Sequence, residues 1–109
     1  MLTIDIHSHK ENVKDATIMC DNAIKMARKD KDRLLCLIVG YGSKGTAHKI
    51  RSATLELLEG YKNKKIIKDY INGNELDIFN PRYQRFIGVD RIPEEEKKKR
   101  NPGAIYISL

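Results

Sequence analysis

The pattern of apolar and polar residues changes period several times along the first half of the chain. Residues 2–7 alternate apolar and polar, which is typical of a strand with one buried face. Apolar residues then recur at helical spacing over 13–27, which predicts a helix ending at about Arg28. The continuous apolar run 34–39 predicts a central strand buried on both faces.

The second half begins with another helical stripe over 47–58, and Gly60 is expected to cap that helix. Residues 66–71 fit either a short strand or the end of a helix. Asn72-Gly73-Asn74 is a turn signal, and Asn80-Pro81 starts a short helix through Ile87. The charged run 94–100 is expected on a loop or a frayed helix. The alternating run 104–109 predicts a terminal strand, so the whole pattern predicts an α/β fold.

The length and composition fit a small globular domain. The chain has 109 residues, of which 40% are hydrophobic and 33% are charged, and we expect one domain. No apolar run approaches the roughly 20 residues of a membrane helix, so no membrane partner is expected. The start lacks a secretory pattern. Cys20 and Cys36 lie within apolar elements and are expected to be buried thiols, which favours a cytoplasmic location.

The positive charge is concentrated in the middle of the sequence. The formal net charge is +6, and residues 43–68 contain seven Lys or Arg against two Glu. These cations are Lys44, Lys49, Arg51, Lys62, Lys64, Lys65 and Lys68. Such a surface attracts polyanions, although a solvated lysine face has the same composition.

A glycine-rich segment follows the central strand. Gly40, Gly42 and Gly45 satisfy the G-x-G-x-x-G pattern of dinucleotide-binding turns. A strand and a helix already precede it and the chain is short for a dinucleotide domain, so no organic cofactor is expected. Backbone N–H groups of 42–46 would still face outward at a helix N-terminus, which is a general anion site. The alternative is a tight turn without a ligand.

A second candidate site lies at the end of the first strand. Asp5 and His7 share one side of the strand and suit a general base or a metal-bound pair. With His9 they form Asp-x-His-x-His, a metal motif of hydrolase barrels. Such barrels need more ligands and about 200 residues or more, so a small metallohydrolase stays an alternative. An exposed Asp beside a structural His is the other alternative.

The order of these segments resembles the small MutS-related (Smr) domain family. The matching segments are Ile4-Asp5-Ile6-His7, Val39-Gly40-Tyr41-Gly42, the helix 47–58 and the turn and strand 101–107. The resemblance implies a two-layer α/β sandwich with a mixed four-stranded sheet in the order β-α-β-α-β-β. It would be one Smr-like domain over 1–109, with an extended segment at about 68–100. It also implies binding of DNA or RNA, and an endonuclease or nicking activity of the kind used in DNA repair or RNA processing.

The resemblance also implies site residues. Asp5 and His7 become the candidate catalytic pair, with Mg²⁺ or Mn²⁺ as the expected cofactor, and Gly40 and Gly42 become the backbone contact. Charge and position add Lys44, His48, Lys49 and Arg51 as candidate phosphate contacts, and the glycine segment adds Ser43 and Gly45. The chain departs from the family pattern at Ser8, which replaces a glycine, and at Val39, which replaces a His or Thr. A non-catalytic nucleic-acid-binding module is therefore the alternative function.

Overall fold

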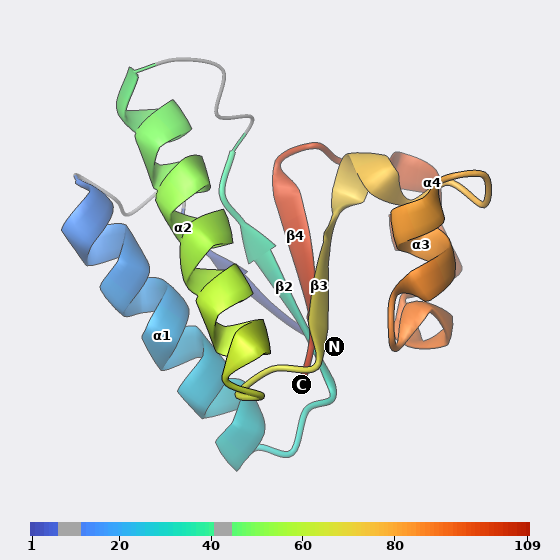
Figure 1. Ribbon diagram of the computed structural model, residues 1–109, viewed down its shortest axis with the longest axis horizontal. Helices are drawn as coiled ribbons and strands as arrows, with labels where there is room; N and C mark the ends of the chain where they lie inside the picture. The colour runs from blue at the N-terminus through green and yellow to red at the C-terminus, as the bar shows by residue number, and fades with distance from the viewer. Residues whose placement is uncertain (7–11, 41–44) are drawn as a thin grey trace.

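The computed structural model describes residues 1–6, 12–40 and 45–109, and contains a mixed four-stranded sheet (Figure 1). The strands lie in the order β1-β2-β4-β3, with β1 parallel to β2 and β4 antiparallel to both of its neighbours. The elements are β1 (Leu2–Asp5), α1 (Val13–Lys29), β2 (Leu34–Ile38), α2 (Gly45–Asn63), β3 (Asp69–Asn72), η1 (Gly73–Glu75), α3 (Pro81–Arg85), η2 (Val89–Arg91), α4 (Glu94–Lys99) and β4 (Ala104–Ser108). The predicted mixed α/β fold is confirmed.

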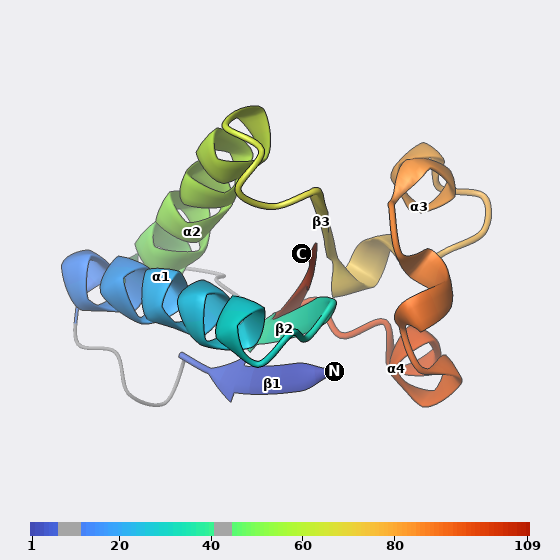
Figure 2. The same cartoon turned by 90° about the horizontal axis from the view of Figure 1, so that it is seen from below.

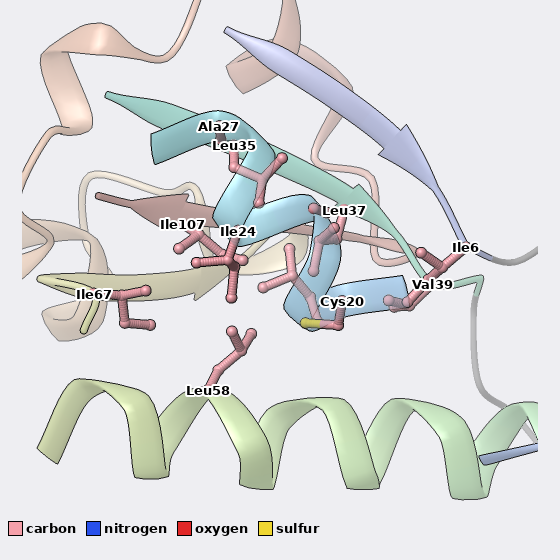
Figure 3. Packing of buried hydrophobic residues seen from close by; sticks show 12 residues of the cluster. Ile6, Cys20, Ile24, Ala27, Leu35, Leu37, Val39, Leu58, Ile67 and Ile107 are labelled. Carbon is pink, nitrogen blue, oxygen red and sulfur yellow. The ribbon is translucent and has the colours of Figure 1, made fainter. Parts of the chain in front are cut away.

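The two long helices cover one face of the sheet (Figures 1 and 3). Strand alternation turns Leu35 and Leu37 of β2 toward this face. Cys20 and Ile24 of α1 and Leu58 of α2 pack against them, and all three are at most 1% exposed. The small buried residues of α1 let that helix lie close to the strands. This layer and the sheet form the expected α/β sandwich.

The segment between β3 and β4 covers the opposite face of the sheet (Figure 2). Leu76, Phe86 and Ile92 of this segment pack against Cys36 of β2 and Tyr106 of β4, and each is at most 4% exposed. The face of the sheet that lies opposite to α1 and α2 is thus also covered, by short helices. This cover explains the continuous apolar run of β2, because a strand buried on both faces has no position for a polar side chain.

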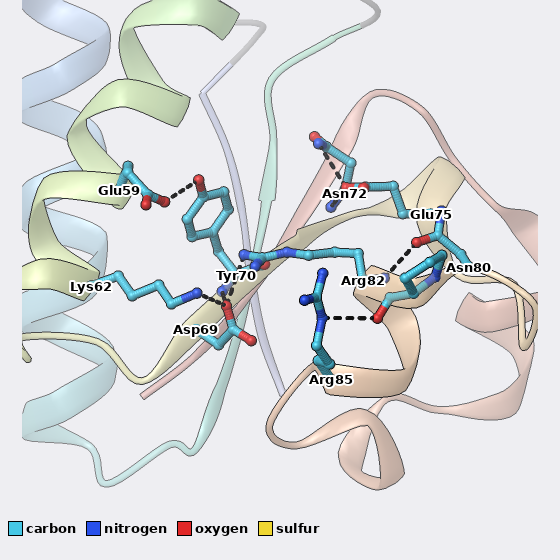
Figure 4. Close-up of polar contacts among 10 residues, drawn as sticks. Glu59, Lys62, Asp69, Tyr70, Asn72, Glu75, Asn80, Arg82 and Arg85 are labelled. Carbon is cyan, nitrogen blue, oxygen red and sulfur yellow. Dashed lines mark hydrogen bonds and ion pairs between the residues drawn. The ribbon is translucent and has the colours of Figure 1, made fainter.

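A buried carboxylate fastens the short helices to the sheet (Figure 4). Asp69 of β3 is 4% exposed, and its Oδ1 accepts from Arg82 Nη2 of α3 at 2.8 Å and lies 3.2 Å from Lys62 Nζ of α2. Arg82 also donates to the Tyr70 carbonyl at 2.6 Å and lies over the Tyr70 ring. Three elements therefore meet at one carboxyl group.

Both long helices end in the same kind of cap. The N–H of Lys31 donates to the Arg28 carbonyl and the N–H of Asp32 donates to Ala27, with Lys31 at φ 59°. In α2 the equivalent bonds run from Lys65 to Lys62 and from Ile66 to Tyr61, with Lys65 at φ 62°. These are Schellman motifs, in which glycine usually occupies the left-handed position.

The expectation that Gly60 caps the second helix is wrong. Gly60 lies within α2, where an added Cβ would meet no atom within 4 Å. The helix continues for another turn because Tyr61 joins the apolar cluster and the cap forms at Lys65 instead. Gly60 therefore occupies an interior position of the helix and does not mark the end of the helix.

The two cysteines are buried, as expected. Cys20 and Cys36 are buried and free, and burial raises the pKa of each thiol to about 12. Such thiols are poor nucleophiles near neutral pH. Among the described residues, no helix is both long enough and apolar enough to cross a membrane.

Candidate nucleic-acid interface

The carboxyl ends of β1 and β2 meet at one edge of the sheet. The strands are parallel, with Asp5 paired with Ile38, and the Ile6 N–H donates to the Ile38 carbonyl at 3.0 Å. Asp5 and Gly40 are 35 positions apart in sequence and still lie at the same edge. We call the surface formed by these strand ends, the start of α2 and the turn at Pro102 and Gly103 the glycine edge.

Gly40 has a conformational role at this edge. Its φ is 79°, in the left-handed region that glycine adopts without strain. The Val39 N–H donates to the Gly103 carbonyl at 2.8 Å, and a Cβ at Gly103 would lie 3.1 Å from the Gly40 carbonyl carbon. Two glycine backbones are thus in close contact, and each is needed for the shape of the edge.

Arg51 holds this turn from inside the protein. Its Nη1 donates to the Pro102 carbonyl and, at 3.4 Å, to the Gly40 carbonyl, while Nη2 donates to Asn72 Oδ1 at 3.0 Å. The guanidinium therefore joins the ends of β2 and β3 and the turn before β4. Contact of Arg51 with phosphate stays a prediction, and its observed contacts are structural.

His48 and Lys49 lie near the start of α2, and both are exposed. They follow Gly45, the first residue of the helix, so they lie within reach of the positive end of the helix dipole. An anion at this end of α2 would meet the Lys49 ammonium and the backbone N–H groups of the first turn. These two residues have the placement that the sequence predicted.

Asp5 is exposed and belongs to the opposite face of the sheet from α2. Ile4 and Ile6 turn toward the helices, so strand alternation directs Asp5 to the face that carries Cys36 and Tyr106. The sequence predicted that Asp5 and the glycine segment act on the same nucleic acid. The structure places Asp5 and Gly40 at one edge, with the Asp5 side chain on the face opposite to α2.

Four candidate residues lie outside the described part of the chain: His7, Gly42, Ser43 and Lys44. Their predicted roles stay predictions. Within the described residues, no three His, Cys, Asp or Glu side chains gather closely enough to hold a metal ion. His7 and His9, which the metallohydrolase alternative requires, lie outside the described residues.

The excess positive charge of 43–68 is divided between the two ends of α2. Lys49 lies near its start, whereas Lys64, Lys65 and Lys68 follow its end. The 15 residues from Lys49 to Lys64 separate these groups by about 22 Å along the helix. The count of charges over 43–68 suggested a single positive patch. That count did not take into account the distance along the helix between the two groups of cations.

Comparison with protein-family models, with curated proteins and with solved structures found no match.

Proposed function

We propose that this chain binds nucleic acid at the glycine edge and hydrolyses a phosphodiester bond there, as its resemblance to Smr domains implies. The observation that carries the proposal is the pairing of β1 with β2, which brings the two motif segments to one edge. Exposed Lys49 and the start of α2 supply positive potential for the phosphate.

Asp5 is the residue in the described part of the glycine edge whose side chain suits phosphodiester hydrolysis. Its exposed carboxylate stands at a strand end and offers the oxygen ligands that Mg²⁺ and Mn²⁺ prefer. Magnesium is commonly bound by one or two carboxylates together with substrate phosphates. The metal, when bound, would polarise the phosphoryl oxygens. Asp5 would hold it or orient the attacking water, and His7 would serve as general acid or base.

The decisive test is cleavage of supercoiled plasmid and structured RNA with Mg²⁺ or Mn²⁺. We expect cleavage by the wild type, and loss of cleavage with retained binding in Asp5→Asn and in the Asp5→Ala/His7→Ala double variant. Asp90→Asn, at another exposed carboxylate, is the matched control and should cleave normally. Cleavage that persists in the purified double variant would show that the site assignment is wrong.

A non-catalytic binding module is the second candidate, and Val39 favours it. This residue occupies the position where the family carries His or Thr, and its side chain is 0% exposed within the apolar cluster beneath α1 and α2. No polar group can act from this position. Retention of nucleic acid in gels without cleavage under either metal would establish this function instead. Absence of both binding and cleavage would refute both.

A further inference from the structure

Seven exposed cations gather at the end of the molecule opposite to the glycine edge. They come from two segments, 28–33 at the end of α1 and after it, and 64–68 after α2. The residues are Arg28, Lys29, Lys31, Arg33, Lys64, Lys65 and Lys68. We call this surface the basic edge. In Figure 1 the C-terminal ends of both helices lie together at the bottom of the view.

Backbone contacts bring the two segments to one place. The Leu109 N–H donates to the Arg33 carbonyl at 3.0 Å, and the Lys68 N–H donates to the Ser108 carbonyl at 2.8 Å. Arg33 and Lys68 therefore lie on either side of the end of β4. Because α1 and α2 each precede a strand that starts at this end of the sheet, their last residues join the same surface.

The positive charge of the basic edge has little compensation nearby. The acidic residues of the two segments are Asp30 and Asp32. Asp69, which follows the second segment, is buried and pairs with Lys62 and Arg82. None of the seven cations forms an ion pair within 4.0 Å with a described residue. The surface therefore presents an excess of positive charge to solvent.

Local folding does not account for this charge. Helix dipoles favour cations in the last turn, which covers Arg28 and Lys29. Lys31 and Lys65 instead occupy left-handed positions, where a residue other than glycine costs roughly 1 kcal/mol or more. Lys64 is part of the end of α2, where its N–H donates to the Gly60 carbonyl at 3.0 Å, whereas Lys68 lies beyond the helix. The charge is better explained by a polyanionic ligand.

We propose that the basic edge binds the phosphate backbone of a second nucleic-acid segment, separate from the one at the glycine edge. The choice of nucleic acid as the polyanion rests on the proposed function. The two edges lie about 28 Å apart along α2. Exposed Glu56 and Glu59 lie between them and would repel a backbone running along that helix. The domain therefore bridges two segments.

The test compares two triple variants that lose the same charge. Lys64→Gln, Lys65→Asn and Lys68→Gln remove three of the seven cations of the basic edge, with asparagine chosen because it tolerates the left-handed position. Arg85→Gln, Lys98→Gln and Lys99→Gln are the control, on exposed side chains of the segment between β3 and β4. Circular dichroism and thermal melting check that both variants fold.

Affinity for a labelled short duplex is measured by fluorescence anisotropy across a range of salt concentrations. Each lost phosphate contact lowers the slope of log K against log salt by about 0.9. We expect the edge variant to lose about two to three slope units and at least about tenfold in affinity at moderate salt. Capture of a labelled duplex on an immobilised one should require wild-type protein and fail with the edge variant.

Each other outcome has a definite meaning. An edge variant that binds and bridges like the control would overturn this inference while leaving the proposed function intact. Lost binding in the edge variant, with unchanged binding in His48→Ala/Lys49→Gln, would support the basic edge and refute the glycine edge. Absence of duplex binding by the wild type would overturn both, as would preferential binding to phosphatidylserine vesicles.

Discussion

At the scale of single residues, Arg51 shows that charge and position in the sequence do not by themselves identify a phosphate contact. A cation six residues into the second helix looked like a phosphate contact, and its neighbour Lys49 is indeed exposed there. Arg51 lies on the inner side of the helix, where three acceptors from other segments surround its guanidinium. Sequence spacing does not identify those acceptors, because Pro102 and Asn72 reach the helix only through the tertiary fold.

We predict that Arg51→Ala destabilises the protein by about 2 kcal/mol, since it removes charged hydrogen bonds to two backbone carbonyls and an amide. Urea denaturation followed by circular dichroism measures the loss. Lys49→Ala is the control, because an exposed side chain on the same helix should change stability by less than about 0.5 kcal/mol. Equal stability of the two variants would contradict the structural role of Arg51.

At the scale of elements, the long periodic segments were predictable and their ends were not. The apolar spacing of α1 and the continuous apolar run of β2 gave their type and approximate bounds. The end of α2 was missed because Gly60 looked like a cap, whereas the left-handed residue is Lys65. Lysine carries no sequence signal for that conformation, so only the backbone geometry identifies the cap.

We predict that Lys31→Gly and Lys65→Gly each stabilise the protein by about 0.5–1 kcal/mol, because glycine adopts the left-handed position without strain. Thermal melting of each single variant measures the gain. Lys29→Gly is the opposite control, since a glycine inside the last helical turn should cost up to about 1 kcal/mol. A loss of stability in either cap variant would contradict the assigned cap geometry.

At the scale of the whole molecule, the sheet and the edge that carries the candidate site residues could be predicted from the order of the elements. A strand-helix-strand pattern with parallel strands places Asp5 and Gly40 at one edge, and the structure does so. The cover over the second face was not predictable, because α3 and α4 are too short to show helical periodicity. Their positions depend on contacts with distant residues such as Asp69 and Tyr106.

Tyrosine-to-carboxylate hydrogen bonds join neighbouring helices and strands of the molecule. The hydroxyl of Tyr61 in α2 donates to Asp21 of α1, that of Tyr70 in β3 to Glu59, and that of Tyr106 in β4 to Glu96. The bond to Asp21, together with burial, raises the pKa of Tyr61 to about 12. Burial and the bond to Glu59 raise the pKa of Tyr70 to about 12, and burial raises that of Tyr106 as well.

We predict that the free energy of unfolding falls as the pH rises from about 10 to about 12. Below the unfolded pKa near 10 the tyrosines are neutral in both states, so their full contribution is present. Above it the unfolded state ionises first, and stability is lost until the folded pKa is reached. Denaturation at several alkaline pH values measures the fall.

Tyr61→Phe should make that fall shallower. Tyr83→Phe is the control, because the Tyr83 hydroxyl donates to no carboxylate within the described part of the chain. The same pH dependence in wild type and Tyr61→Phe would show that the Tyr61 hydroxyl does not titrate as described.

The two ends of the described chain emerge beside the basic edge. Leu2 pairs with Leu35 and Leu109 contacts Arg33, so both ends adjoin the start of β2 from its two sides. An affinity tag or a fused protein at either end would therefore lie over the basic edge and shield its cations, while the glycine edge would stay accessible. Binding measured on tagged protein would report the glycine edge alone, and tag removal should restore the steeper salt dependence.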